Sequence, residues 1–206
     1  MDEQIGRLRA QLKELEIEQN TLIFFCSDNG PADSLTKKGV ASAGKFKGHK
    51  HRMYEGGLLV PACAVWPGVY PAGADVDTRC STVDYFPTIA TACNYHLGKN
   101  KRRPIDGVDL SPIIGGDVAR RDKPLFFGFR RLNRGIDGLA VIDGDYKLLK
   151  EAKPNGRVRM YDLNQDPYEK HDLASEQVEK FAELQQLMIG IDENCASSRD
   201  GADYRY

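Results

Sequence analysis

The chain has 206 residues, of which 41% are hydrophobic and 29% charged, and its formal net charge is −1. These values are typical of a soluble globular protein with one good-sized domain or two small ones. The mixed charges give no electrostatic basis for a nucleic acid partner, and no apolar run is long enough for a transmembrane segment. Residues 1–20 are acidic and amphipathic and do not resemble a signal peptide, and the sequence makes no prediction of localisation.

The cysteine content argues against a disulfide framework or a zinc site. The chain has five cysteines, and their spacing includes no C-x-x-C pair. We therefore expect buried free thiols at Cys26, Cys63, Cys80, Cys93 and Cys195.

The first elements expected along the chain are a helix and a strand. Apolar residues recur at helical spacing over 5–15 with charges between them, which predicts a helix of about four turns. Residues 21–26 are apolar in succession, as in a strand that is covered on both faces. A helix followed directly by such a strand is typical of an α/β layer architecture.

The next segment, 31–51, is rich in glycine and lysine and poor in apolar residues. A loop of this length in a compact domain is usually functional or disordered. A second short buried strand is expected within 58–68, and the apolar spacing in 81–93 predicts a helix. Pro87 must then lie in the first turn of that helix or produce a kink.

We place a domain boundary near residue 120, which gives domains of 1–120 and 121–206. Beyond it, short strands are expected at 124–129, 138–143, 146–150 and 158–163, with hairpin turns at 143–144 and 155–156. A final helix is expected from Ser175, with Val178, Phe181, Leu184 and Met188 on one face. The second domain is therefore predicted to be a small antiparallel sheet packed against one helix.

The sequence Ser27-Asp28-Asn29-Gly30, directly after the first strand, has two interpretations. Asn-Gly is a common turn dipeptide, so the segment is compatible with a surface turn. Alternatively, the Asp28 carboxylate and the Asn29 amide present oxygens to a hard cation. The chain would have to bend for both side chains to reach one ion, and Gly30 would give the backbone that freedom.

Several motifs, in order along the chain, resemble those of the sulfatase family, whose members are relatives of alkaline phosphatase. The first set consists of SDNG at 27–30, Lys50 five residues before Glu55-Gly56-Gly57, Val60-Pro61, and Trp66-Pro67-Gly68. STVDYFPTIATAC at 81–93, DGVDLSPIIGG at 106–116 and MYDLNQDPYEKHDLA at 160–174 are similar to later segments of the family. Each motif is weak alone, but together they cover most of the chain.

The resemblance implies an α/β fold with two parts. Residues 1–120 would be the C-terminal portion of the sulfatase catalytic domain, with its mixed sheet, and 121–206 the antiparallel sheet and helix subdomain. It also implies that Asp28 and Asn29 are calcium ligands and that Lys50 binds the sulfate group of the substrate. The substrate would be a sulfate ester, either a sulfated glycan or an aryl sulfate. His49 and His51 flank Lys50 and are given no role.

The resemblance further implies that the first half of the catalytic domain is absent from this chain. That half carries more metal ligands and a Cys or Ser nucleophile that is converted to formylglycine. We therefore expect part of a sulfuric ester hydrolase that is inactive alone, with the missing N-terminal half as its partner. CASSR at 195–199 imitates the nucleophile motif Cys-x-Pro-x-Arg, but Ser197 replaces the expected Pro. We interpret this segment as a coincidence in a polar tail after the last helix.

Two other functions are compatible with parts of the sequence. Phosphatases and phosphodiesterases of the same superfamily normally use two zinc ions held by several His and Asp ligands. The chain has four His residues without metal-type spacing, which gives this alternative little support. A non-catalytic remnant or binding module would retain the fold without the chemistry.

Overall fold

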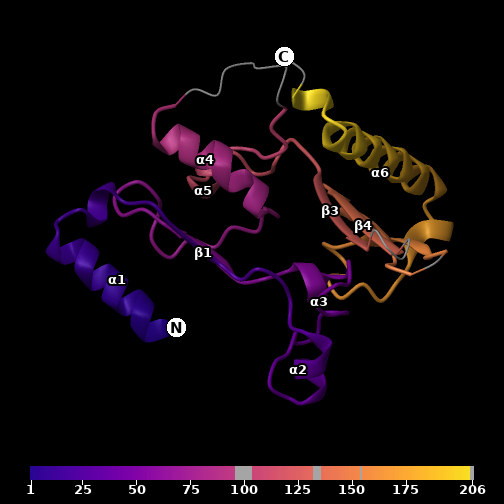
Figure 1. Ribbon diagram of the computed structural model, residues 1–206, viewed down its shortest axis with the longest axis horizontal. Coiled ribbons are helices and arrows are strands. Elements are labelled where there is room, and N and C mark those ends of the chain that lie inside the picture. Colours follow the sequence, from indigo (N-terminus) through magenta and orange to yellow (C-terminus); the bar gives the residue numbers. More distant parts are fainter. Residues whose placement is uncertain (96–103, 132–135, 154, 205–206) are drawn as a thin grey trace. The chain divides into compact units, whose positions relative to one another are not determined.

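The computed structural model describes residues 1–95, 104–131, 136–153 and 155–204, and the chain forms two compact units (Figure 1). The first unit comprises Met1–Ser27, Pro61–Gly98 and Asp106–Arg121. The second comprises Asp28–Val60, Lys99–Ile105 and Asp122–Tyr206. The segment that carries Asp28, Asn29 and Lys50 is therefore grouped with the C-terminal residues, while domains of 1–120 and 121–206 stay a prediction.

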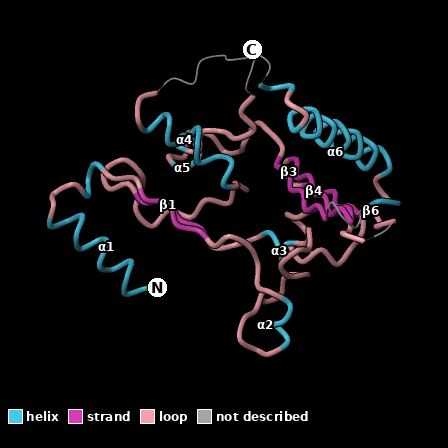
Figure 2. Tube along the Cα trace, in the orientation of Figure 1, coloured by secondary structure: helices cyan, strands magenta, loops and turns pink. Residues whose placement is uncertain are grey.

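The first unit contains a helix, a pair of strands and two further helices (Figure 2). Helix α1 (Asp2–Glu14) leads through a short 3₁₀ turn to β1 (Ile23–Cys26), which pairs antiparallel with β2 (Ala62–Val65). Helix α4 (Tyr85–Ala92) and the short α5 (Ser111–Ile114) follow. The expected helix, both expected strands and the helix within 81–93 are thus confirmed, and the mixed sheet around β1 stays a prediction.

The burial of β1 differs from the sequence expectation. Phe25 in β1 is 40% exposed and Val65 in β2 is 42% exposed. The apolar sequence is enough to form a strand, but its burial depends on a layer that covers it. Among the described residues β1 is hydrogen-bonded to β2 alone, so the expectation of a strand buried on both faces is wrong for this chain. Three of the four residues of β2 are exposed, so the expected burial of the second strand is also wrong.

Buried polar groups connect α4 to the segment that contains α5. Asp84 is fully buried and accepts a hydrogen bond from the Val108 N–H at 2.9 Å. The same carboxylate pairs with both terminal nitrogens of Arg121, at 2.7 and 3.1 Å. Thr88, one turn further along, accepts the Leu110 N–H at 2.9 Å. Two of the family-like segments, 81–93 and 106–116, therefore meet through buried hydrogen bonds.

The second unit contains a four-stranded antiparallel sheet in the order β3-β4-β5-β6. The strands are β3 (Leu125–Arg131), β4 (Ile136–Asp143), β5 (Tyr146–Lys150) and β6 (Val158–Asp162). Gly144 has φ +58 in the turn between β4 and β5, which is the left-handed conformation that glycine tolerates. The predicted sheet is therefore confirmed.

The two faces of this sheet pack against different segments. One face, with Val141 and Leu148, is covered by Leu184 and Met188 of the long helix α6 (Val178–Arg199). Side chains alternate along a strand, so Ile142 and Leu149 lie on the other face. There they pack with Met53 and Tyr54, which directly precede the short helix α3 (Glu55–Leu58). The sheet thus supports the segment that contains Lys50.

The end of the chain corrects two predictions. Helix α6 begins at Val178, and Ser175 instead ends a short 3₁₀ helix, Leu173–Ser175, which Asp172 caps by accepting the Ala174 N–H. Helix α6 also continues to Arg199. The segment CASSR therefore forms the last turns of α6, and its interpretation as a polar tail after the helix is wrong.

The states of the cysteines and the apolar character of the helices were also predicted from the sequence. All five cysteines are free thiols, as expected, but four are exposed and Cys26 is half-buried, so the expected burial is wrong. Within the described ranges, no helix has both the length and the apolar character needed to cross a membrane.

Candidate functional site

The two motifs that carry the candidate residues meet through glycine backbones. Gly30 N–H donates to Gly57 O at 3.0 Å, and a Cβ on Gly30 would lie 2.0 Å from Gly56 O. No side chain fits in that space, and Gly30 does not need a positive φ. Glycine is therefore required here for close approach, and not for the backbone freedom that we expected.

Asp28 and Asn29 lie in the bend that follows β1, as the metal interpretation requires. Asp28 is exposed, and Asn29 is half-buried with its Nδ2 donating to Gly30 O at 3.0 Å. A carboxylate and an amide oxygen suit a hard cation and would supply two of the roughly six to eight oxygens that calcium takes. In the part of the chain that the structure describes, no three His, Cys, Asp or Glu side chains are grouped to hold a metal.

Lys50 lies on a loop that is fixed to the segment after Asn29. Its backbone N–H donates to Pro31 O at 2.8 Å. Lys50 is one of the residues that line a cavity of about 460 Å³. The cavity is lined by Ala32, Asp33, Ser34, His49, Lys50, His51, Arg52, Phe129 and Ala152, all of which belong to the second unit. Lys50 therefore lines this cavity, whereas Asp28 and Asn29 are not among its lining residues.

The cavity has more cationic than anionic side chains. Its one carboxylate, Asp33, is bound by Lys37 Nζ at 2.7 Å, one turn along helix α2 (Asp33–Lys37). His49 Nε2 lies 3.6 Å from Asp33 Oδ1. The hydrogen bond from Lys37, followed by the charges of Lys37, His49 and Arg52, lowers the pKa of Asp33 below its ordinary value. Asp33 therefore keeps its charge near neutral pH and is already paired.

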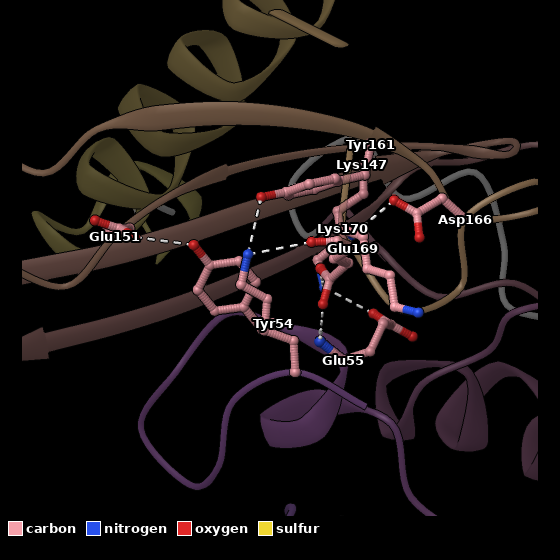
Figure 3. A network of polar contacts seen from close by, with 9 residues as sticks. Tyr54, Glu55, Lys147, Glu151, Tyr161, Asp166, Glu169 and Lys170 are labelled. Atoms are coloured by element: carbon pink, nitrogen blue, oxygen red, sulfur yellow. Dashed lines mark hydrogen bonds and ion pairs between the residues drawn. The ribbon is translucent and has the colours of Figure 1, made fainter. Parts of the chain in front are cut away.

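A buried polar network holds the Lys50 loop on the sheet (Figure 3). Lys147 on β5 is fully buried, and its Nζ lies 2.7 Å from Glu55 Oε1 and 2.9 Å from Glu169 Oε1. The other oxygen of Glu169 accepts the Glu55 N–H at 2.7 Å. Because both carboxylates are also buried, the lysine supplies the charge that makes their burial possible. Glu55 is thus a structural residue that fixes the Glu-Gly-Gly turn.

Lys47, which is on the same loop as Lys50, also contacts this network. Lys47 Nζ lies 4.4 Å from the centre of the Tyr54 ring and donates to Glu169 O at 3.1 Å. The Tyr54 hydroxyl in turn donates to Glu151 at 2.9 Å. Lys47 is therefore occupied by structural contacts. The functional role of Lys50 stays a prediction.

Glu169 reaches the interior because of an unusual turn. Its φ is +55, the left-handed region that most side chains avoid. The Asp166 carboxylate holds the turn by accepting the Lys170 and His171 N–H groups at 2.7 and 2.8 Å. This arrangement gives a physical reason for the Asp-Pro…Glu part of the family-like segment at 160–174.

Sequence reasoning missed the buried network. By sequence, Lys147 is an ordinary charge within the strand YKLLK. Strand periodicity places it on the same face as Leu149, and this was the signal that could have predicted its burial. No comparable signal marked Glu169, because its position depends on the turn at 166–171.

Comparisons with known proteins agree with the motifs. A family model described as Sulfatase matches residues 1–95. N-acetylgalactosamine-6-sulfatase of Canis lupus familiaris is 36% identical over 148 residues, which are 71% of this chain and 27% of that protein. Steryl-sulfatase of Homo sapiens is 37% identical over 133 residues, which are 63% of this chain and 22% of that protein.

The fold agrees with a solved structure over nearly the whole chain. The crystal structure of Ps i-CgsB in complex with k-i-k-neocarrahexaose matches with a TM-score of 0.78 and 27% sequence identity. The match covers 94% of this chain and 40% of that chain. The chain therefore spans about a quarter of the length of these curated relatives and two fifths of this structure.

Proposed function

Because the chain belongs to the sulfatase family of the alkaline phosphatase superfamily, we propose that it supplies the sulfate-binding lysine and part of the metal site of a sulfuric ester hydrolase. The substrate is a sulfate ester of a glycan or an aryl alcohol. Names of the relatives support this class, since one acts as an N-acetylgalactosamine-6-sulfatase and another as a steryl-sulfatase.

The observation that carries this proposal is the position of Lys50 in the cavity. Within the described residues its ammonium has no ion pair or hydrogen bond, in contrast to Lys47 and Lys147. An uncompensated ammonium can bind a sulfate oxygen. Its charge then stabilises the negative charge that develops as the ester S–O bond breaks.

The metal part of the proposal rests on Asp28 and Asn29. Their oxygens would hold a calcium ion, which would neutralise charge on the sulfate group. They supply a minority of the oxygens that calcium needs. The remaining ligands and the nucleophile come from a polypeptide that corresponds to the other part of the relatives' length. Without that polypeptide, we expect weak calcium binding and no catalysis.

The direct test is the binding of a sulfated sugar to the chain and to two lysine variants. Amide NMR titration with a monosulfated N-acetylgalactosamine is expected to perturb residues 31–34 and 49–52 in the wild type. Lys50→Ala should weaken binding by about tenfold or more, since a hydrogen bond to a charged group contributes about 1.5–3 kcal/mol. Lys45→Ala removes an exposed lysine of the same loop and is the matched control. Equal affinity of wild type and Lys50→Ala would refute the proposal.

A further inference from the structure

The cavity beside Lys50 has more positive charge than the binding of one sulfate group requires. Lys50 and Arg52 are basic side chains, and His49 and His51 add two imidazoles. The one lining carboxylate, Asp33, is already neutralised by Lys37 at 2.7 Å. The cavity therefore has a cationic group, Arg52, for which the proposed function gives no use.

Arg52 has the chemistry of a binding residue and no structural task for its side chain. It is exposed, and across the described ranges its guanidinium has no hydrogen bond or ion pair with another side chain. The backbone of Arg52 contributes to the loop structure, because its N–H donates to His49 O at 2.9 Å. A guanidinium presents a planar fork of donors, which matches the two oxygens of a carboxylate or of a sulfate.

The wall next to Arg52 is built from an aromatic pair in a constrained conformation. The His51 ring stacks on Phe129 of β3, with 4.8 Å between the ring centres and 27° between their planes. His51 has φ +70, a left-handed backbone that is uncommon for a residue other than glycine. Such conformations persist where the surrounding structure fixes them, and they are concentrated at binding sites. His51 is thus held against Phe129 at the edge of the cavity.

The size of the cavity also exceeds the needs of one sulfate group. Its volume of about 460 Å³ lies within the range of roughly 300–1,000 Å³ that is usual for small-molecule sites. The cavity can therefore hold a sugar ring together with its substituents. Phe129 and Ala152 supply apolar surface for the ring, and Lys50 and Arg52 supply two separate charges.

We propose that this cavity binds a saccharide with two anionic groups: Lys50 holds the sulfate that is removed, and Arg52 binds a second oxyanion. The second group is a carboxylate or another sulfate, and both offer the paired oxygens that a guanidinium recognises. Arg52 is then a specificity-determining residue that favours polyanionic saccharides over singly charged sulfate esters. This inference rests on the proposed function of Lys50.

The experiment compares three ligands on the full chain by isothermal titration calorimetry. The ligands are monosulfated N-acetylgalactosamine, the disulfated form of the same sugar, and a monosulfated disaccharide in which this sugar is linked to a uronic acid. The wild type should bind at least one doubly anionic ligand about tenfold more tightly than the monosulfated sugar, as expected for one charge-assisted contact. Which of the two is preferred identifies the second anion as a sulfate or a carboxylate.

The variants separate a specific contact from general attraction to negative charge. Arg52→Gln should abolish the preference, and its affinity for the doubly anionic ligand should fall much more than its affinity for the monosulfated sugar. Lys45→Gln removes one charge from the same loop outside the cavity and should keep the preference. Arg52→Lys keeps the charge without the fork and should retain part of the preference. Amide NMR spectra establish that each variant is folded.

Several results would overturn the inference without affecting the proposed function. One such result is binding that depends on Lys50 but is no tighter for the doubly anionic ligands than for the monosulfated sugar. Another is a preference for a doubly anionic ligand that is still present in Arg52→Gln. An equal loss in Lys45→Gln and Arg52→Gln would assign the preference to general electrostatics. Conversely, a preference that needs Arg52 but not Lys50 would support an anion site here and refute the sulfate-binding role of Lys50.

Discussion

Lys147 is the residue on which the position of the candidate site most depends. It is fully buried between Glu55 and Glu169, and Glu55 begins the turn that follows the Lys50 loop. Such a triad need not add much net stability, but removing one partner leaves buried charges uncompensated. The Lys50 loop is thus fixed by residues that do not line the cavity.

The first prediction concerns the removal of this charge. Lys147→Met should lower the free energy of unfolding by about 3–5 kcal/mol, because Glu55 and Glu169 would remain buried without a cation. Urea denaturation measures this change. Lys150→Met alters a half-buried lysine on the same strand and should cost much less. Similar losses for the two variants would argue against the role given to Lys147.

A second prediction follows from the protonation of Glu169. Burial, the largest effect, raises the pKa of its carboxyl above 4.5, although the Lys147 charge lowers it. The folded state therefore keeps this proton to a higher pH than the unfolded state. Binding of this proton therefore contributes to the free energy of unfolding. The contribution is fully present below about pH 4.5 and is lost as the pH rises through the pKa of the folded state.

Glu169→Gln cannot ionise and should escape that loss. Its free energy of unfolding, relative to the wild type, is expected to improve as the pH rises from 4.5 toward neutrality. Urea denaturation at several pH values gives the comparison. Glu179→Gln makes the same chemical change on the exposed side of α6 and is the matched control. A relative stability of Glu169→Gln that falls with rising pH would contradict a raised pKa for this carboxyl.

At the residue scale, the sequence identified only some of the lysines that matter for the site. The spacing of Lys50 to Glu55-Gly56-Gly57 marked it as the candidate sulfate-binding residue, and it lines the cavity, but its role stays a prediction. The metal roles of Asp28 and Asn29 stay predictions. The roles of Lys147 and Glu169 depend on contacts between residues far apart in the chain, which one sequence does not reveal.

Among the elements, those with a strong local pattern were predicted well. The four strands of the second unit alternate or run apolar between clear turns, and all four form. Helix α4 forms where expected, with Pro87 in its first turn. Phe86 and Ile89, which contribute to the apolar spacing that predicted it, are nevertheless 59% and 45% exposed. Periodicity predicts that a helix exists, while tertiary contacts decide which face is buried.

Helix α6 provides the third prediction. Leu184 is fully buried against the sheet, so Leu184→Ala should cost about 2–5 kcal/mol in the free energy of unfolding. Ile189 is on the same helix but is 44% exposed, and Ile189→Ala should cost far less. Thermal or urea denaturation compares the two variants. Equal costs would mean that α6 does not pack on the sheet in this orientation.

For the whole molecule, the main limit of sequence reasoning was the surroundings of β1. Its apolar sequence predicted a buried strand, yet Phe25 and Val65 are more than one-third exposed. The relatives are about four times longer than the matched segment of this chain. We therefore propose that the part of a sulfatase that this chain does not match would cover the exposed apolar surface of β1 and β2. The same part would carry the nucleophile.

A sulfate ester hydrolysis assay on this chain tests the proposed division of the catalytic machinery most directly. Nitrophenyl sulfate is incubated in calcium buffer with the wild type, Lys50→Ala and Cys195→Ala. We predict release of nitrophenol at the rate of buffer alone in all three, because loss of a nucleophile costs several orders of magnitude in rate. Calcium-dependent turnover by the wild type that is abolished in both variants would contradict this prediction, because CASSR at the end of α6 would then be a working nucleophile.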